Sequence, residues 1–384
     1  MQVFAPLTPA AGLGATGQPF RWGPVTLHPH LLYRVLYGNG IASSPGQQHN
    51  TIVQQVSPGI LFNIGTHWSL DYTPTWSFYS SGQFRNTLDH NVNLGWGTGY
   101  GDWFFHAMQN CAITSDPQVE TGGQTDQQNY STALDATGRL NDRLSLDLGL
   151  NQDLNFVSSG NSSTNYLQGL ANSRSWSTMD WLNYQFWPRL NVGLGVGFGY
   201  YQQDSSPNAI NEQYQARVNW RATDKISFQL SGGLQDQQYL SGGANDLLTP
   251  IFGATIQYQP FEQTRLTLNA TRAVSPSAFQ NQVTETTSIS VGLNQRLFGA
   301  LYLDLGGGYV ATKYDASNVG SATSRSDDYY NFNARLTYPF LKRGTIAVFY
   351  QYSDNSSSQS GFLAAGSSFA YTSSQMGVEL GYRY

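Results

Sequence analysis

The stretch Leu190-Asn-Val-Gly-Leu-Gly-Val-Gly-Phe-Gly-Tyr200 alternates large apolar residues with glycine, after a single asparagine at position 191. Successive side chains of a β-strand point to opposite faces of the sheet, so this stretch would present one apolar face and one nearly bare face. A helix would instead group residues three and four positions apart, and the stretch does not follow that spacing. It therefore predicts a strand with different surroundings on its two sides.

The same period of two recurs along nearly the whole chain. Residues 68–78, 226–234 and 287–297 repeat the pattern, whereas 101–113, 174–187 and 344–353 carry apolar residues on both faces, which leaves their phase open. Segments of ten or more residues suit tilted strands that cross an apolar layer about 25 Å thick. Eighteen strands are predicted, at 25–37, 51–63, 66–79, 86–96, 101–113, 128–139, 143–156, 174–187, 189–203, 210–222, 225–238, 248–259, 264–274, 284–297, 300–313, 328–339, 344–353 and 371–384.

The composition fits a sheet with lipid on one face and water on the other. Charged residues make up 11% of the chain, against about 25% in typical soluble domains, and aromatic residues make up 14%. The mean hydropathy is nevertheless -0.37, and no run approaches the roughly 18 apolar residues of a transmembrane helix. A net charge of -5 with scattered Lys and Arg offers no basic surface, so we expect no nucleic-acid partner.

The connections between the predicted strands alternate in length. Those after odd-numbered strands are mostly long and polar, as in 38–50 and 157–173. Those after even-numbered strands are short: Gly65, 140–142, 187–188, 223–224, 260–262, 298–299 and 341–343. This asymmetry is typical of membrane barrels, whose short turns lie at the periplasmic end. Together with the strand pattern it predicts an all-β fold, a single antiparallel up-and-down transmembrane β-barrel. We expect eighteen strands, with sixteen as the alternative, and both termini in the periplasm.

The final residues, Val378-Glu-Leu-Gly-Tyr-Arg-Tyr384, alternate in the same way and stop on an aromatic side chain. This ending resembles the terminal strand of Gram-negative outer-membrane β-barrels, which the barrel-assembly machinery reads as an insertion signal. The resemblance implies that Val378, Leu380, Tyr382 and Tyr384 carry this signal. It also implies a bacterial outer-membrane location, with outer-membrane lipid and the assembly machinery as partners. Residues 1–24 lack the features of a signal peptide, so we read the sequence as the mature, exported form.

Over residues 25–384 the chain resembles bacterial outer-membrane porin-like proteins, and in particular the β-barrel porins associated with extracellular-polysaccharide loci. Residues 1–24 would then be an irregular segment in the periplasm or inside the lumen. The polar phase would line the lumen with amides, hydroxyls and a few charges of both signs, a wall that can hydrogen-bond sugar hydroxyls. The candidate lining residues are Asp71, Thr73, Asp89, Asn91, Asn93, Ser145, Asp147, Gln215, Arg217, Asn219, Gln229, Asn269, Asn294, Arg296, Asn331, Asn333 and Arg335.

Other chemistry finds little support in the sequence. Gly12-Leu-Gly-Ala-Thr-Gly17 matches a dinucleotide-binding spacing, but no predicted strand precedes it. His28 and His30 share one face of a strand, yet no nearby carboxylate completes a metal site. Cys111 is the only cysteine, which excludes an internal disulfide. We expect no catalytic residues, no metal, no cofactor and no enzyme activity.

The leading functional hypothesis is a porin-like channel for passive diffusion of small hydrophilic solutes, saccharides among them. No separate plug domain precedes the strands, which argues against energy-coupled uptake. The alternative is a non-conducting structural or assembly barrel that anchors a partner protein or a surface polysaccharide. A homo-oligomer and an envelope protein partner both stay open.

Overall fold

The computed structural model describes residues 20–39, 49–82, 84–115, 124–158, 171–204, 206–241, 246–277, 282–316, 325–358 and 369–384. The Gly12–Gly17 motif and most of segment 1–24 lie outside these ranges. Within them no helix is long and apolar enough to cross a membrane. The strands are β1 Phe20–Trp22, β2 Val25–Asn39, β3 Thr51–Ile64, β4 Trp68–Tyr79, β5 Thr87–Tyr100, β6 Trp103–Thr114, β7 Asp126–Arg139, β8 Leu144–Ser158, β9 Ser173–Trp187, β10 Leu190–Gln203, β11 Ala209–Arg221, β12 Ile226–Tyr239, β13 Leu247–Phe261, β14 Thr264–Pro276, β15 Gln282–Leu297, β16 Leu301–Ala316, β17 Arg325–Phe340, β18 Gly344–Ser357 and β19 Tyr371–Arg383.

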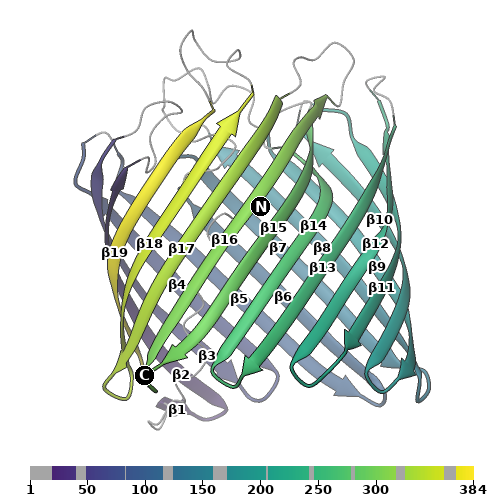
Figure 1. Ribbon diagram of the computed structural model, residues 1–384, viewed down its shortest axis with the longest axis horizontal. Helices are drawn as coiled ribbons and strands as arrows, with labels where there is room; N and C mark the ends of the chain where they lie inside the picture. The colour runs from purple at the N-terminus through teal and green to yellow at the C-terminus, as the bar shows by residue number, and fades with distance from the viewer. Residues whose placement is uncertain are drawn as a thin grey trace.

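Strands β2 to β19 form one closed antiparallel barrel (Figure 1). Each strand pairs with the next in sequence, and β19 pairs with β2 to complete the ring. This confirms the prediction of eighteen barrel strands. The short strand β1, in a segment that we expected to be irregular, forms a small hairpin with the start of β2. Closure leaves no exposed strand edge, so the backbone polar groups of the wall are satisfied within the sheet.

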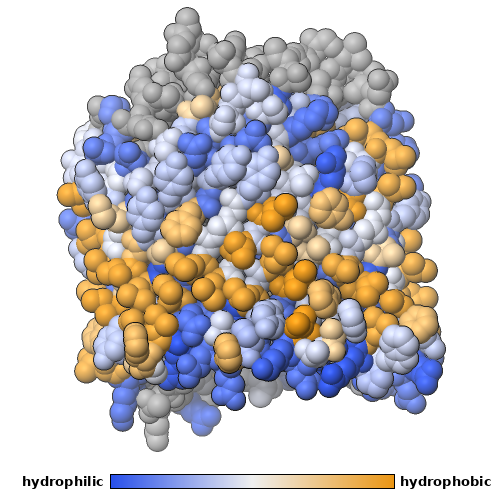
Figure 2. Space-filling model, in the orientation of Figure 1, coloured by the Kyte–Doolittle hydropathy of each residue, from blue (hydrophilic) through white to orange (hydrophobic). Residues whose placement is uncertain are grey.

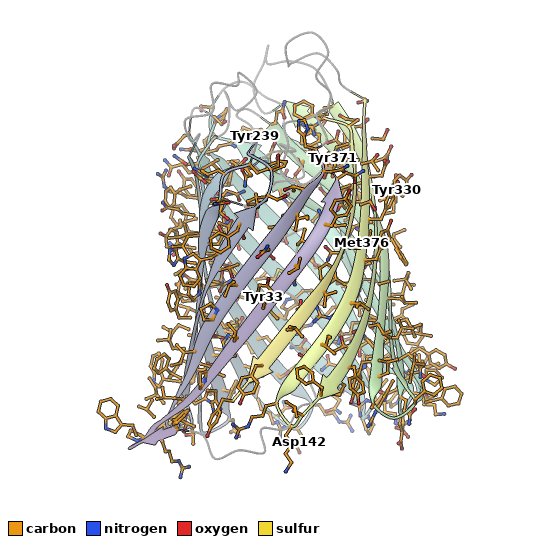
Figure 3. All side chains as sticks on the ribbon, turned by 90° about the vertical axis from the view of Figure 1, so that its left-hand side faces the viewer. Tyr33, Asp142, Tyr239, Tyr330, Tyr371 and Met376 are labelled. Atoms are coloured by element: carbon orange, nitrogen blue, oxygen red, sulfur yellow. The ribbon has the colours of Figure 1, made fainter. Side chains whose placement is uncertain are left out.

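The short turns gather at one end of the barrel, and the strand ends that flank the longer connections gather at the other (Figure 1). Asp142 lies in a short turn, whereas Tyr239 and Tyr371 lie near the opposite end (Figure 3). We call these the turn end and the loop end. One predicted strand, 86–96, ends earlier than the observed β5, which continues to Tyr100 through Gly97 and Gly99. The alternation of apolar and polar residues is lost at these glycines. Those glycines carry no side chain to mark the face.

The apolar phase of the strands is the exposed one. On β10, Leu194 is 70% exposed and Val196 is 57% exposed, whereas Gly193 and Gly195 on the alternate phase are buried. Figure 2 shows the result as an apolar belt across the visible face, with hydrophilic residues above and below it. Aromatic pairs flank the belt: Trp68–Trp96 and Trp220–Phe228 near the turn end, Tyr130–Phe156 and Trp176–Tyr200 toward the loop end. Such aromatic girdles mark the two headgroup levels of a membrane.

Candidate channel lining

The predicted lining residues all occupy the strand phase opposite to the exposed apolar residues. Their registers show this directly, since Asp71 pairs with Asn93 and Arg217 with Ser231, whereas Leu70 pairs with the exposed Leu94. The same holds for Thr73, Asp89, Asn91, Ser145, Asp147, Gln215, Asn219, Gln229, Asn269, Asn294, Arg296, Asn331, Asn333 and Arg335. These residues therefore share one face of the sheet, and their role in lining a channel stays a prediction.

Side chains on this face meet across strands that are not neighbours in the sheet. Arg217 on β11 pairs with Asp147 on β8, although β9 and β10 lie between them. Arg335 on β17 pairs with Glu379 on β19 across β18. Side chains converge in this way only on the concave side of a curved sheet and splay apart on the convex side. We therefore infer that this face lines the lumen.

Asp147, Asn183 and Arg217 form one cluster on the lumen wall. Asn183 Nδ2 donates to Asp147 Oδ2 at 2.9 Å, and Asn183 Oδ1 accepts from Arg217 Nε at 2.9 Å. The cluster lies above Gly193 of β10, where a Cβ atom would come 2.6 Å from Asn183 Oδ1. Charge-assisted hydrogen bonds of this kind fix the guanidinium in place. The glycine face of β10 thus makes room for side chains from the strands beside it.

Trp181 extends the same arrangement. Its ring lies under the guanidinium of Arg217, with Cζ 4.3 Å from the ring centroid. A Cβ atom at Gly195 would come 2.6 Å from Trp181 Cε3, so the indole also lies against the bare backbone of β10. The indole is therefore packed between the guanidinium of Arg217, in a cation–π contact, and the backbone of β10. Trp181 is therefore an apolar residue on the lumen phase, which explains the ambiguous pattern of 174–187.

A second charged cluster lies on the opposite wall, because β10 and β19 are nine strands apart in an eighteen-strand ring. Glu379 is only 4% exposed and is shared by two arginines. Arg34 Nη2 lies 2.8 Å from Glu379 Oε2, and Arg335 pairs with the other carboxylate oxygen. The guanidinium of Arg34 also lies 5.2 Å from the ring of Phe349. Both arginines are thus compensated and only slightly exposed.

The wall formed by β4 to β8 carries carboxylates without such compensation. Asp71 accepts a hydrogen bond from Thr73 Oγ1 at 3.2 Å, and Asp153 accepts one from Ser131 Oγ at 2.6 Å. Asp135 is 53% exposed, with His106 Nδ1 at 3.5 Å. Within the described part of the chain, neither arginine nor lysine lies within 4.0 Å of these three carboxylates. Acidic charge therefore faces the lumen on this side.

The lumen narrows toward the loop end. Leu36, Val53, Phe84 and Phe349 form a buried apolar cluster inside the barrel, with Tyr79 packed against it. Gln203 Nε2, at the loop end of β10, donates to the carbonyl oxygen of Ser277 at 2.9 Å, just beyond β14. These two strands are four apart in the sheet, so the contact crosses the interior. Among the described residues, these contacts place packed side chains inside the barrel toward its loop end.

Several site residues were missing from the sequence prediction. Asp135, Asp153 and Glu379 all lie on the polar phase of predicted strands, so the alternation alone could have included them. Asn183 and Trp181 belong to the segment whose phase was open, and their roles depend on Gly193 and Gly195 of the next strand. That relationship is visible only once the strands are paired.

The apolar residues of the terminal strand all lie on one face of the sheet. Val378, Leu380 and Tyr382 point outward and are 44%, 40% and 47% exposed. Tyr384 follows the strand, and its ring stacks on Phe20 with centroids 4.7 Å apart. The carbonyl oxygen of Tyr384 lies 3.4 Å from His28 Nδ1 on the lumen face. The outward apolar row is thus continuous with the belt.

One family of known proteins matches part of the chain. Residues 195–382 match the family described as "putative beta-barrel porin 2". No curated protein matches the sequence. The crystal structure of Acinetobacter baumannii OccAB3 is similar at 8% identity and a TM-score of 0.49, with 93% of this chain and 99% of that chain covered. Pseudomonas aeruginosa OccK2 (OpdF) is similar at 11% identity and a TM-score of 0.49, with 93% and 98% covered. The family match, the closed eighteen-strand ring and the outward apolar belt together identify the chain as a porin-like β-barrel of the bacterial outer membrane.

Proposed function

We propose that the protein is a passive channel for small hydrophilic solutes and that it favours cations over anions. The observation that carries this proposal is the set of carboxylates on the β4–β8 wall, Asp71, Asp135 and Asp153, that have no arginine or lysine of the described chain within 4.0 Å. Arg34, Arg217 and Arg335 are each held by a carboxylate and are 14–23% exposed at the side chain. The side chains of Asp71 and Asp135 are 35% and 53% exposed, and the basic residue within 4.0 Å of each is a histidine, His30 or His106.

Paired and unpaired charges on the wall act differently on ions in the pore. A paired guanidinium and carboxylate largely cancel beyond a few ångströms, whereas an unpaired carboxylate in a confined aqueous pore attracts cations over about one Debye length, roughly 8 Å at physiological salt. Acidic rings and walls favour cations in pores of many kinds. Asp71 on β4 and Asp135 on β7 lie toward the turn end, and Asp153 on β8 lies toward the loop end, so these carboxylates would raise the local cation concentration along this wall.

The rest of the wall supports uncharged polar solutes. Asn91, Asn93 and Asn110 form an amide ladder, with Asn110 Nδ2 donating to Asn93 Oδ1 at 2.6 Å. Asn331 and Asn333 line the other side. Amides offer both donors and acceptors, which suits sugar hydroxyls, so small saccharides are included among the proposed solutes. We also propose that the turn end faces the periplasm, with both termini there, and that the terminal strand carries the insertion signal.

The packed loop end supports a second candidate, a non-conducting barrel with a structural role. The cluster of Leu36, Val53, Phe84 and Phe349, together with the Gln203–Ser277 contact, narrows the passage. In that case the lumen would be closed by the protein itself, and the barrel would anchor a partner protein or a surface polysaccharide.

Liposome swelling separates the two candidates. Purified protein is reconstituted into liposomes, which are then diluted into isotonic solutions of uncharged solutes of increasing size. If the protein is a channel, the liposomes should swell in small sugars, and the swelling rate should fall as the solute becomes larger. A non-conducting barrel predicts no swelling above protein-free liposomes, and that result would overturn the proposed function.

A further inference from the structure

One strand of the barrel places two apolar side chains on the lumen face and leaves them exposed. Phe104 and Met108 on β6 are 55% and 47% exposed. Both belong to the face that carries the predicted lining residue Asn93, because Phe104 pairs with Gly99 and Met108 pairs with Gly95. Hydrocarbon in contact with water is unfavourable, and an exposed apolar surface often marks a place where another molecule binds.

A carboxylate lies between the two apolar side chains. Asp135 on β7 pairs with His106, which stands midway between Phe104 and Met108 on β6. Diagonal neighbours on one face of an antiparallel pair are about 7–8 Å apart, within reach of aromatic and long side chains. Asp135 therefore has a phenyl ring on one side along the strand and a thioether on the other. We call Phe104, His106, Met108 and Asp135 the lumen patch.

The carboxylate of Asp135 is open to a ligand. Its side chain is 53% exposed, and the basic group within 4.0 Å of it, among the described residues, is His106 Nδ1 at 3.5 Å from Oδ2. On its other side Asp135 pairs with Gly149 of β8. A Cβ atom at Gly149 would lie 3.7 Å from Asp135 Oδ1, so at this register β8 has no side chain that could cover the carboxylate.

The aromatic groups of the patch rest on the glycine face of β5. A Cβ atom at Gly97 would lie 3.4 Å from Phe104 Cζ and 3.9 Å from His106 Cδ2. The bare backbone thus makes room for the phenyl ring and the imidazole, which lie beside it while Phe104 keeps much of its surface exposed. Groups held in place before binding lose less conformational freedom when a ligand arrives, which favours affinity.

We propose that the lumen patch binds small organic cations in which an ammonium group is attached to an apolar body. Asp135 pairs with the ammonium group, and Phe104 and Met108 contact the apolar body. Charge and shape select this class, because Asp135 repels an anion and a simple metal ion makes no use of the apolar groups. The binding site stands on the geometry of the patch, and its role in passage through the lumen rests on the proposed function.

The test follows binding of benzylammonium to the full chain in detergent, by nuclear magnetic resonance of ¹³C-labelled methionine methyl groups. The Met108 resonance should shift and saturate as the probe is added, because the ring of the probe lies against it. Met376, 57% exposed on the outward face of β19, reports uptake of the probe by detergent and should not shift. Benzyl alcohol, which has the ring without the charge, should require at least a tenfold higher concentration for half-saturation.

Variants of the patch separate the two kinds of contact. Asp135→Asn should raise the half-saturating concentration of benzylammonium about tenfold, which corresponds to about 1.4 kcal/mol. Phe104→Ser should raise it severalfold. The matched control is Asp153→Asn on the same wall, because Asp153 pairs with Ser131 and Ser175 and so has polar neighbours in register. This control should stay within twofold of the native chain.

Currents in planar bilayers connect the patch to passage. Benzylammonium should reduce the K⁺ current of the native chain, and Asp135→Asn should weaken this block about tenfold. The resonance measurement does not need conduction, so a silent bilayer with a saturable Met108 shift would overturn the proposed function and still support the patch. An unshifted Met108 resonance, equal binding of benzyl alcohol, or an effect of Asp153→Asn as large as that of Asp135→Asn would overturn the inference.

Discussion

Arg34 and Glu379 form a salt bridge across the seam that closes the barrel. Arg34 Nη2 lies 2.8 Å from Glu379 Oε2, and the two residues face each other in the register of β2 and β19. They are 345 positions apart in sequence, so the contact forms only when the last strand meets the first. Arg335 of β17 binds the same carboxylate, so Glu379 ties three strands together at the seam.

The first prediction concerns the stability of this seam. Glu379→Gln leaves two guanidinium groups without a counter-charge in a nearly buried site, and breaking a buried pair from one side costs about 3–5 kcal/mol. We expect the free energy of unfolding to fall by that order, measured in urea by the shift between folded and unfolded bands on a cold denaturing gel. Glu262→Gln, in an exposed turn, is the control and should change little. If the two variants are equally stable, Glu379 does not stabilise the seam of the barrel.

The second prediction tests the packing role of the β10 glycines. A side chain at Gly195 would overlap Trp181 and Met179, with a Cβ only 2.6 Å from Trp181 Cε3. Gly195→Val should therefore destabilise the barrel by about 1–3 kcal/mol, as overpacking usually does. Gly292→Val is the control, because a Cβ there meets no atom within 4 Å. Urea unfolding of both variants checks this, and a Gly195 variant as stable as the control would contradict it.

The third prediction tests which face meets lipid. Leu194 is 70% exposed on the outward phase, while Gln215 lies on the lumen phase of the neighbouring strand. An arginine on the lipid face near mid-membrane costs about 2–4 kcal/mol, whereas a lumen arginine stays hydrated. Leu194→Arg should lower the free energy of unfolding in lipid vesicles by that amount, and Gln215→Arg should leave it nearly unchanged. The reverse order would mean that the two faces are assigned wrongly.

The fourth prediction concerns the Asp147–Arg217 pair. Arg217→Gln frees the carboxylate of Asp147 and should raise the preference for K⁺ over Cl⁻. Asp147→Asn frees the guanidinium and should lower that preference. Reversal potentials in a KCl gradient measure both, and each change should be severalfold in the permeability ratio, because the pair lies on the pore wall. Two variants that shift selectivity in the same direction would show that the pair does not face the ion path.

Much of this architecture was visible in the alternation of the sequence, which predicted eighteen strands and the short turns between them. The sequence pattern left the phase of 174–187 and 344–353 open, and both cases have the same physical cause. Phe349 packs against Leu36 and Val53, so β18 places an apolar residue in the lumen phase. Trp181 lies there because β10 offers a bare backbone. The sequence of one strand does not show which residues of distant strands its side chains will contact.

Charge pairing was beyond the sequence for the same reason. Arg217 and Asp147 are 70 positions apart, and Arg335 and Glu379 are 44 positions apart. The composition shows charges of both signs, and it gives no way to tell which of them neutralise each other. Ion preference depends on that difference, so it becomes a prediction only once the registers of all eighteen strands are known.

The most direct test of an open, cation-favouring lumen is the reversal potential of the purified protein in a planar bilayer under a tenfold KCl gradient. The native chain should conduct, with a reversal potential displaced toward that of K⁺. Combined Asp71→Asn, Asp135→Asn and Asp153→Asn substitutions should move it back toward zero at similar conductance. A silent bilayer, or a native reversal potential displaced toward that of Cl⁻, would contradict the assignment of these carboxylates to a conducting wall.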